Sequence, residues 1–138
     1  MDSPWTFEGS NFPTAPEDMI GFVYLITNNV TGKKYVGKKL FWSKVTKPPL
    51  KGQKRKRRSL KESDWKTYLS SSDELKRQIE EYGIDNFSRE IIKLCADRGV
   101  LSYYEAKYQF DNDVLMKPDE YINGIIQCRI HRKHVYNK

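Results

Sequence analysis

The chain has 138 residues and a mass of 16.3 kDa, which is enough for one domain and leaves no room for a second of ordinary size. Aromatic residues make up 13 %, which argues against a disordered chain, and the lack of a long apolar run excludes a transmembrane helix. The 25 lysines and arginines exceed the 18 aspartates and glutamates, and the net charge of +7 favours a polyanionic partner.

The beginning of the chain predicts an arm followed by a β-hairpin. Residues 1–19 contain several prolines and three large aromatic residues, so we expect an arm that packs on the domain through its rings. Residues 22–27 are rich in β-branched and aromatic residues, and residues 33–37 resume an extended pattern. The polar cluster at 28–32 ends in a glycine and predicts the turn between two antiparallel strands.

A basic insertion is predicted to follow at residues 44–63. Ten basic and two acidic residues lie between Lys44 and Lys66, so the whole positive excess of the chain falls in this segment. A proline pair and a glycine argue against a long helix there, and we expect a loop. Such a concentration of cations favours contact with nucleic acid; the alternatives are a solvated loop without a partner and a localisation tag.

Two helices are predicted next. Residues 64–68 indicate a short helix capped by Ser63. A longer amphipathic helix follows, in which Ser71 and Glu74 fit a capping box and Gly83 marks the end.

The second half of the chain predicts one strand and one further helix. Phe87–Leu94 indicates a largely buried strand, and Val100–Phe110 an amphipathic helix. The element order predicts a small α/β sandwich, with a short mixed or antiparallel three-stranded sheet flanked by helices.

Glu105 is the first candidate for chemistry. On the helix 100–110 it shares one face with Leu101, Tyr104 and Tyr108. A carboxylate on a face that meets the core is costly unless it is paired or binds a metal, and its oxygens suit Mg²⁺. Two structural alternatives remain open: Ser102 and Glu105 fit a capping box, or Glu105 lies at the edge of the face and pairs with a lysine.

Tyr24 and Tyr35 are the second candidates, because they lie on the two hairpin strands and share a pocket if the register places them on the same side. A tyrosine acts as a general base only when nearby cations lower its pKa from about 10. We expect Lys39 to have this effect, and Gly37 to let a phosphate or the following backbone approach closely. The alternative is that both tyrosines are ordinary residues of the sheet and core.

The two cysteines, Cys95 and Cys128, form no CxxC motif, and we expect free thiols in a reducing, intracellular setting. Together with His131 and His134 they could supply four zinc ligands, although the spacing is not that of a standard zinc finger. The residues Met1-Asp2-Ser3-Pro4 predict no secretory signal.

Four short motifs occur in order along the chain. They are Gly21-Phe22-Val23-Tyr24, Tyr35-Val36-Gly37, Tyr82-Gly83-Ile84-Asp85-Asn86-Phe87 and Tyr121-Ile122-Asn123. Glu105 falls on the helix between the last two. This ordered set resembles the signature of the GIY-YIG nuclease family, and in particular its small stand-alone phage-type members.

The resemblance implies hydrolysis of phosphodiester bonds in double-stranded DNA with Mg²⁺ or Mn²⁺, because a metal and fixed cations stabilise the charge that builds up. It makes Glu105 the metal ligand, Tyr24 and Tyr35 the hairpin pair that helps to deprotonate a water, and Asn123 a polar group that shapes the site. The alternatives are a nucleic-acid-binding module of the same fold without activity and a basic RNA-associated protein.

The sequence departs from the family pattern after the second motif. Many members carry an arginine and then a histidine there, whereas residues 41–45 contain neither. The resemblance then places Tyr68 where the histidine would be, and Lys39, Lys66 or a loop arginine such as Arg58 as the catalytic cation. The residues expected to contact DNA are Lys38, Lys44, Lys54, Arg55, Lys56, Arg57 and Arg58.

We therefore expect an N-terminal arm at 1–19 and a GIY-YIG-like nuclease domain at 20–138, with the basic insertion at 44–63 and a basic tail at 129–138. The expected location is the cytoplasm, which for a phage protein is that of the infected host, without membrane contact.

Overall fold

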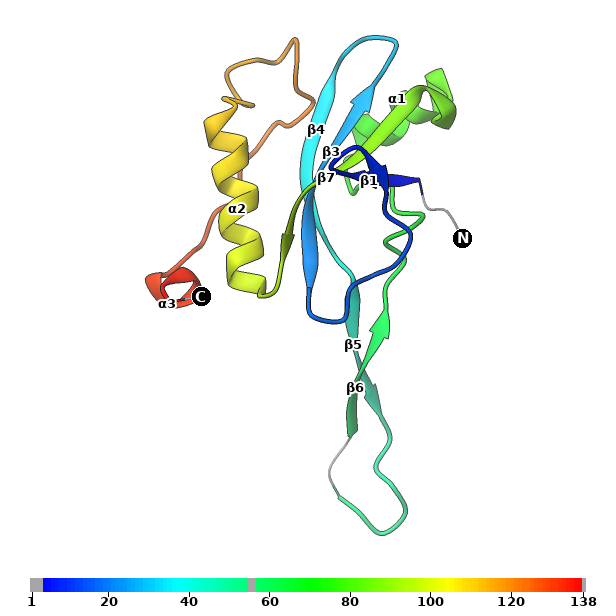
Figure 1. The fold of residues 1–138 in the computed structure, drawn as a ribbon, viewed down its shortest axis with the longest axis vertical. Helices are drawn as coiled ribbons and strands as arrows, with labels where there is room; N and C mark the ends of the chain where they lie inside the picture. The colour runs from blue at the N-terminus through cyan, green and yellow to red at the C-terminus, as the bar shows by residue number, and fades with distance from the viewer. Residues whose placement is uncertain (1–3, 55–56, 138) are drawn as a thin grey trace.

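The computed structural model describes residues 4–54 and 57–137 and has a mixed α/β fold around a five-stranded sheet of order β2-β1-β7-β3-β4 (Figure 1). The strands of this sheet are β1 (Trp5–Phe7), β2 (Ser10–Asn11), β3 (Gly21–Asn28), β4 (Lys34–Leu40) and β7 (Phe87–Cys95). The predicted α/β class, the β3–β4 hairpin and the strand β7 are confirmed. The expected three strands are the core of a larger sheet, which has five.

The two additional strands come from the N-terminal arm. β1 pairs in parallel with β7 and antiparallel with β2, which makes the sheet mixed. Trp5 is fully buried, with its ring centroid 5.0 Å from that of Phe22, and its Nε1 donates a hydrogen bond to the carbonyl of Trp65 at 2.7 Å. The arm therefore packs on the domain through its aromatic side chains and also extends the sheet.

The helices are α1 (Asp73–Tyr82), the 3-10 turn η1 (Ile84–Asn86), α2 (Arg98–Asp111) and α3 (Arg132–Val135). Gly83 ends α1 at a φ of 87°, as predicted, but the N-cap is Ser72 rather than Ser71, because the Ser72 side chain accepts the hydrogen bond from Leu75 N. Asp97 caps α2. Glu105 consequently lies beyond the first turn of α2, and the capping-box alternative for Ser102 and Glu105 is wrong.

The central strand β3 is covered on both faces. α2 lies over the face that carries Val23 and Val36, where Leu101 is buried. The opposite face carries Phe22 and Tyr24 and is covered by the N-terminal arm (Figure 1). Trp65 packs in the same core, against Phe22. Directly opposed residues of β3 and β4 share a face, so the two cores alternate along both strands.

The basic insertion forms a two-stranded ribbon, and the expectation of a loop is wrong for the half of it that lies in the strands. β5 (Trp42–Lys47) and β6 (Arg57–Glu62) pair antiparallel and project from the end of the five-stranded sheet (Figure 1). The sequence predicted a loop because the segment contains prolines and a glycine. These residues fall only in the connection between the strands, so they do not interrupt the pairing. The short helix expected at 64–68 is also wrong: the segment makes a single turn, since Trp65 is drawn into the core.

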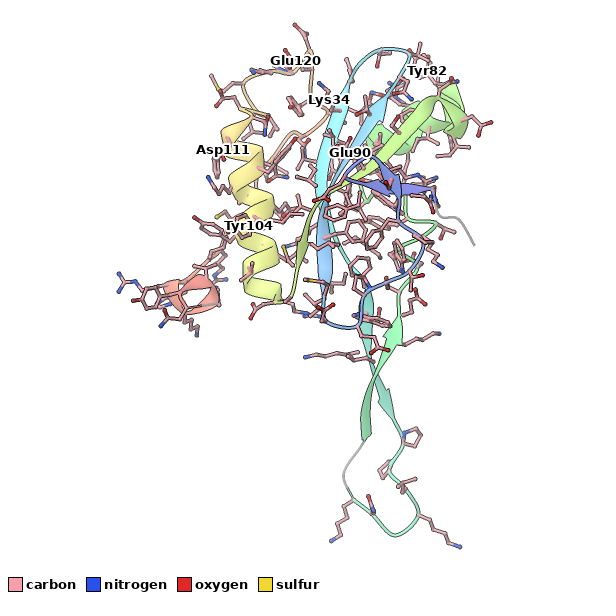
Figure 2. All side chains as sticks on the ribbon, in the orientation of Figure 1. Lys34, Tyr82, Glu90, Tyr104, Asp111 and Glu120 are labelled. Carbon is pink, nitrogen blue, oxygen red and sulfur yellow. The ribbon has the colours of Figure 1, made fainter. Side chains whose placement is uncertain are left out.

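The segment after α2 returns to the outer edge of β4. Lys34 N donates a hydrogen bond to the carbonyl of Glu120, and Ile122 N donates one to the carbonyl of Lys34, so Lys34 and Glu120 lie together (Figure 2). This contact brings the last family motif beside the second one. No helix in the described ranges, 4–54 and 57–137, has the length and apolar character needed to cross a membrane.

Candidate active site

The register of the β3–β4 hairpin places the two candidate tyrosines on the same face. Tyr24 lies opposite Gly37, and Tyr35 lies opposite Ile26, two residues along the strand from Tyr24. Because side chains alternate along a strand, Tyr24 and Tyr35 project to the same side. Their ring centroids are 6.3 Å apart. The condition for a shared pocket is therefore met.

Gly37 leaves the space that the Tyr24 ring occupies. A Cβ at position 37 would overlap with the Tyr24 hydroxyl and would lie 2.5 Å from its Cζ. Gly37 is not among the glycines with a positive φ, so the requirement is for space and not for an unusual backbone conformation. The expectation that a phosphate or the following backbone lies against Gly37 is corrected, because the Tyr24 ring fills this place.

Tyr68 is the third tyrosine of the cluster. Its ring meets that of Tyr24 edge-on, with centroids 6.0 Å apart. The Nζ of Lys39 lies 4.2 Å from the centroid of the Tyr68 ring and 2.7 Å from Oδ1 of Asp64. Through these two contacts, Lys39 links strand β4 of the hairpin to the turn that carries Tyr68.

Glu105 reaches the same cavity from the other face of the sheet. The Glu105 carboxylate and the three tyrosines line one cavity of about 250 Å³. This is possible because β4 is an edge strand of the sheet. The Glu105 side chain is 16 % exposed, and its Oε1 lies 3.8 Å from Lys38 Nζ. Glu105 therefore pairs with a lysine, as one structural alternative predicted, but the two atoms are too far apart for a hydrogen bond.

Lys38 is the cation that lines this cavity among the described residues. Its Nζ donates a hydrogen bond to Ser102 Oγ at 2.8 Å, which holds the ammonium beside Glu105. The cations expected from the sequence lie elsewhere. Lys39 is on Tyr68, and Lys66 Nζ is 5.8 Å from the Trp65 ring centroid. Arg58 belongs to β6 of the ribbon.

Asn123 fixes the edge strand beside the cavity. Its Oδ1 accepts a hydrogen bond from Val36 N at 3.0 Å, and its Nδ2 donates one to the Val36 carbonyl at 2.8 Å. Gln109 Nε2 donates to the same carbonyl at 3.1 Å. Gln109 was missed in the sequence, although it follows Glu105 by one helical turn, a spacing that places the two side chains on one face.

Ser70 is a second residue that the sequence did not single out for the site. It is 3 % exposed and has a φ of 95°, a region that residues with a side chain rarely adopt. Its Oγ accepts a hydrogen bond from Ser72 N at 2.9 Å. Such strained residues cluster at functional sites, and this one lies against the tyrosine hydroxyls.

Burial dominates the electrostatics of the cavity. Desolvation raises the pKa of Glu105, and the Lys38 ammonium opposes the shift. Desolvation also raises the pKa of Tyr24 and of Tyr35, although hydrogen bonding to Ser70 acts in the opposite sense. Both phenols are therefore protonated at neutral pH. The expected lowering of a hairpin phenol pKa by Lys39 is wrong, because burial outweighs it and the ammonium lies against Tyr68.

The residues expected to contact DNA lie mainly on the ribbon. Lys44 and Lys54 are exposed there, and Arg57 and Arg58 belong to β6. Residues 55–56 lie outside the described part of the chain.

The four residues of the zinc alternative do not form a site. Cys95 is buried in the sheet and Cys128 is exposed, each as a free thiol. The Nδ1 atoms of His131 and His134 accept backbone hydrogen bonds at the start of α3. Within the described residues no group of three or more His, Cys, Asp or Glu side chains is placed to hold a metal ion.

Residues 5–126 match the protein-family model described as "Putative endonuclease segE, GIY-YIG domain". The matched range begins at β1 and includes every residue that lines the cavity from β3, β4 and α2, as well as Tyr68 and Asn123. No curated protein and no solved structure matches the chain.

Proposed function

Because this chain belongs to the GIY-YIG endonuclease family, we propose that it is a divalent-metal-dependent endonuclease that hydrolyses phosphodiester bonds in double-stranded DNA. The observation that carries the proposal is the cavity at the edge of β4. A half-buried carboxylate enters it from one face of the sheet, and three tyrosines enter it from the other. The exposed basic ribbon beside it supplies the charge that DNA requires.

The residues present fit Mg²⁺ or Mn²⁺ at Glu105. Burial disfavours the charged carboxylate, and among the residues that the structure describes it is paired with Lys38 at 3.8 Å, so a divalent ion would offset a real energetic cost. One protein carboxylate is typical for Mg²⁺, which keeps several waters and shares the substrate's phosphate oxygens. When bound, the ion would supply positive charge beside the scissile phosphate.

The chain's own residues would divide the remaining work. Lys38, held by Ser102, is placed to bind a non-bridging oxygen of the scissile phosphate, the role that an arginine has in many family members. Tyr24 and Tyr35, as neutral phenols, would orient the attacking water through hydrogen bonds, with Ser70 between their hydroxyls. Asn123 and Gln109 hold the edge of β4 so that these distances persist.

The free thiols favour a reducing compartment, and we propose action in the cytoplasm.

The test is nicking of supercoiled plasmid by the wild type and by Glu105→Gln, with Mg²⁺ and with EDTA. The wild type is expected to nick only with the metal. Glu105→Gln keeps the shape of the side chain but loses its charge, so cleavage should fall by at least about a hundredfold while DNA binding persists. Binding without any nicking by the wild type would favour the inactive binding module. Full activity of Glu105→Gln would overturn the metal assignment.

A further inference from the structure

The β5–β6 ribbon is anchored firmly at one end. Phe41, which connects β4 to β5, is fully buried, and its carbonyl accepts a hydrogen bond from Ser63 N at 2.7 Å just after β6. The fully buried Trp65 packs on Phe41 with ring centroids 5.1 Å apart, and its Nε1 donates to Glu62 Oε1 at 2.8 Å. Trp42 Nε1 donates to the carbonyl of Met19 at 3.0 Å. The direction of the ribbon is thus fixed by the core.

The ribbon carries only positive charges beyond its base. Residues 44–61 contain nine lysines and arginines and no acidic residue. In the register, Ser43 lies opposite Lys61 and Lys44 lies opposite Leu60. Since successive pairs project to opposite faces, Lys61 and Lys44 leave the ribbon on different sides. Cations on both sides suit a segment that lies between two phosphate backbones.

A second cavity connects the ribbon to the proposed active site. It has a volume of about 390 Å³, and its polar lining consists of Lys38, Lys39, Ser43, Ser63, Arg98 and Ser102. Lys38 also lines the cavity of Glu105, while Ser43 belongs to β5. The two cavities and the ribbon therefore form one continuous cationic path, which we call the basic track.

We infer that the β5–β6 ribbon is a DNA-binding arm that lies in the major groove of a duplex, and that the second cavity carries the phosphate backbone between the arm and the cleavage site. The inference rests on the proposed function and adds the groove that the ribbon enters and the course of the phosphate backbone. The major groove is about 12 Å wide and admits a two-stranded β-ribbon in undistorted DNA, whereas the minor groove, at about 6 Å, would have to widen at a cost in deformation energy.

The reach of the arm agrees with this geometry. The chain runs from Gly37 beside the active site to Trp42 at the base of the ribbon, about 17 Å of extended strand, and β5 adds about 20 Å more. At about 3.4 Å per base pair, the arm would meet the duplex about 5 to 11 base pairs from the scissile phosphate. The far end of this interval lies about one turn of the DNA helix from the scissile phosphate, so one arm spans a single major groove.

The test uses the full chain and a 30-base-pair duplex of random sequence in EDTA, so that binding is measured without cleavage. The arm variant replaces four exposed lysines of the ribbon by glutamine, namely Lys44, Lys51, Lys54 and Lys61. The control variant makes the same replacement at four exposed lysines outside the basic track, namely Lys76, Lys107, Lys117 and Lys133. Both variants lose the same charge, and thermal unfolding verifies that each is folded.

The arm variant is expected to bind the duplex about tenfold or more weakly than the control variant, with a slope of log K against log salt that is about 2 to 4 units shallower. Methyl green, which occupies the major groove, should displace the wild type, and netropsin, which occupies the minor groove, should not. Equal losses of duplex affinity in the two variants would mean that the ribbon acts only through the net charge of the protein, and this result would overturn the inference. So would displacement by netropsin alone, or tighter binding to structured RNA than to duplex DNA. None of these binding measurements depends on cleavage. The groove assignment can therefore hold if the proposed nuclease activity is wrong, and the nuclease activity can be right if the groove assignment is wrong.

Discussion

Replacing Gly37 by alanine tests whether the position of the Tyr24 ring matters for cleavage. The new Cβ would lie 2.5 Å from Tyr24 Cζ, whereas carbon atoms in contact are separated by about 3.5 Å, so the ring must move by about 1 Å. Tyr24 is 1 % exposed and packs between Trp5 and Tyr68, which leaves little space for the movement. Overpacking of this kind costs about 1 to 3 kcal/mol.

The effect on cleavage should exceed the effect on stability. A displacement of about 1 Å in a reacting group lowers turnover about a hundredfold, so we expect Gly37→Ala to remain folded, to bind DNA and to cleave about a hundred times more slowly. Single-turnover nicking in Mg²⁺ measures the rate, and thermal unfolding measures the stability.

Gly124→Ala is the matched control, because a Cβ at position 124 meets nothing within 4 Å although the residue follows Asn123. It should behave as the wild type. In a double-mutant cycle, Tyr24→Phe should recover part of the stability lost by Gly37→Ala, since the overlapping hydroxyl is removed. Wild-type cleavage by Gly37→Ala would refute the placement of Tyr24 in the reaction.

Two further predictions concern the charged residues. Lys38→Ala should slow cleavage far more than Lys39→Ala, because Lys38 lines the cavity whereas Lys39 lies on Tyr68 and pairs with Asp64; equal losses in single-turnover nicking would contradict the assignment. Glu105→Gln should raise the melting temperature at neutral pH without metal. Burial raises the pKa of Glu105 in the folded state, so the folded protein holds its proton more tightly, and ionisation destabilises the fold as the pH rises above the unfolded value of 4.5. The gain should therefore shrink as the pH falls toward 4.5 and vanish below that value, and a gain that is independent of pH would exclude this origin.

The central hairpin was predictable because its signals are local. The run of β-branched and aromatic residues at 22–27 and the turn at 28–32 define two strands whatever lies around them. The arm strands β1 and β2 were not predictable in this way, since they are only three and two residues long, and the sheet joins them through β1, which pairs with β7 about eighty positions away. Their stability comes from the burial of Trp5, a tertiary contact that no local pattern shows.

The site was predictable to a different degree for each residue. Glu105 could be predicted because it is a charged residue on a helical face that is otherwise apolar and aromatic. Lys38 was expected only to contact DNA, because its place in the cavity depends on β4 being an edge strand and on the hydrogen bond to Ser102. Ser70 was not predicted as a site residue, because the serine run 70–72 favours a helix cap and nothing in the local sequence indicates a φ of 95°.

The prediction that a hairpin tyrosine acts as the general base is wrong for one physical reason, and that reason changes the roles of the residues in the site. Lysines beside a tyrosine in sequence suggested a phenolate, but burial raises the pKa of Tyr24 and Tyr35, so neither can serve as a pre-ionised base. Among the described residues, the charged groups that line the cavity are the ammonium of Lys38 and the carboxylate of Glu105, whose charges cancel. A phosphodiester entering this cavity would bring an uncompensated negative charge, and the cleavage transition state would bring more. A divalent cation at Glu105 supplies the missing charge, whereas the ribbon supplies affinity at a distance from the reacting atoms. Binding should therefore respond chiefly to monovalent salt, and the chemical step to the divalent ion.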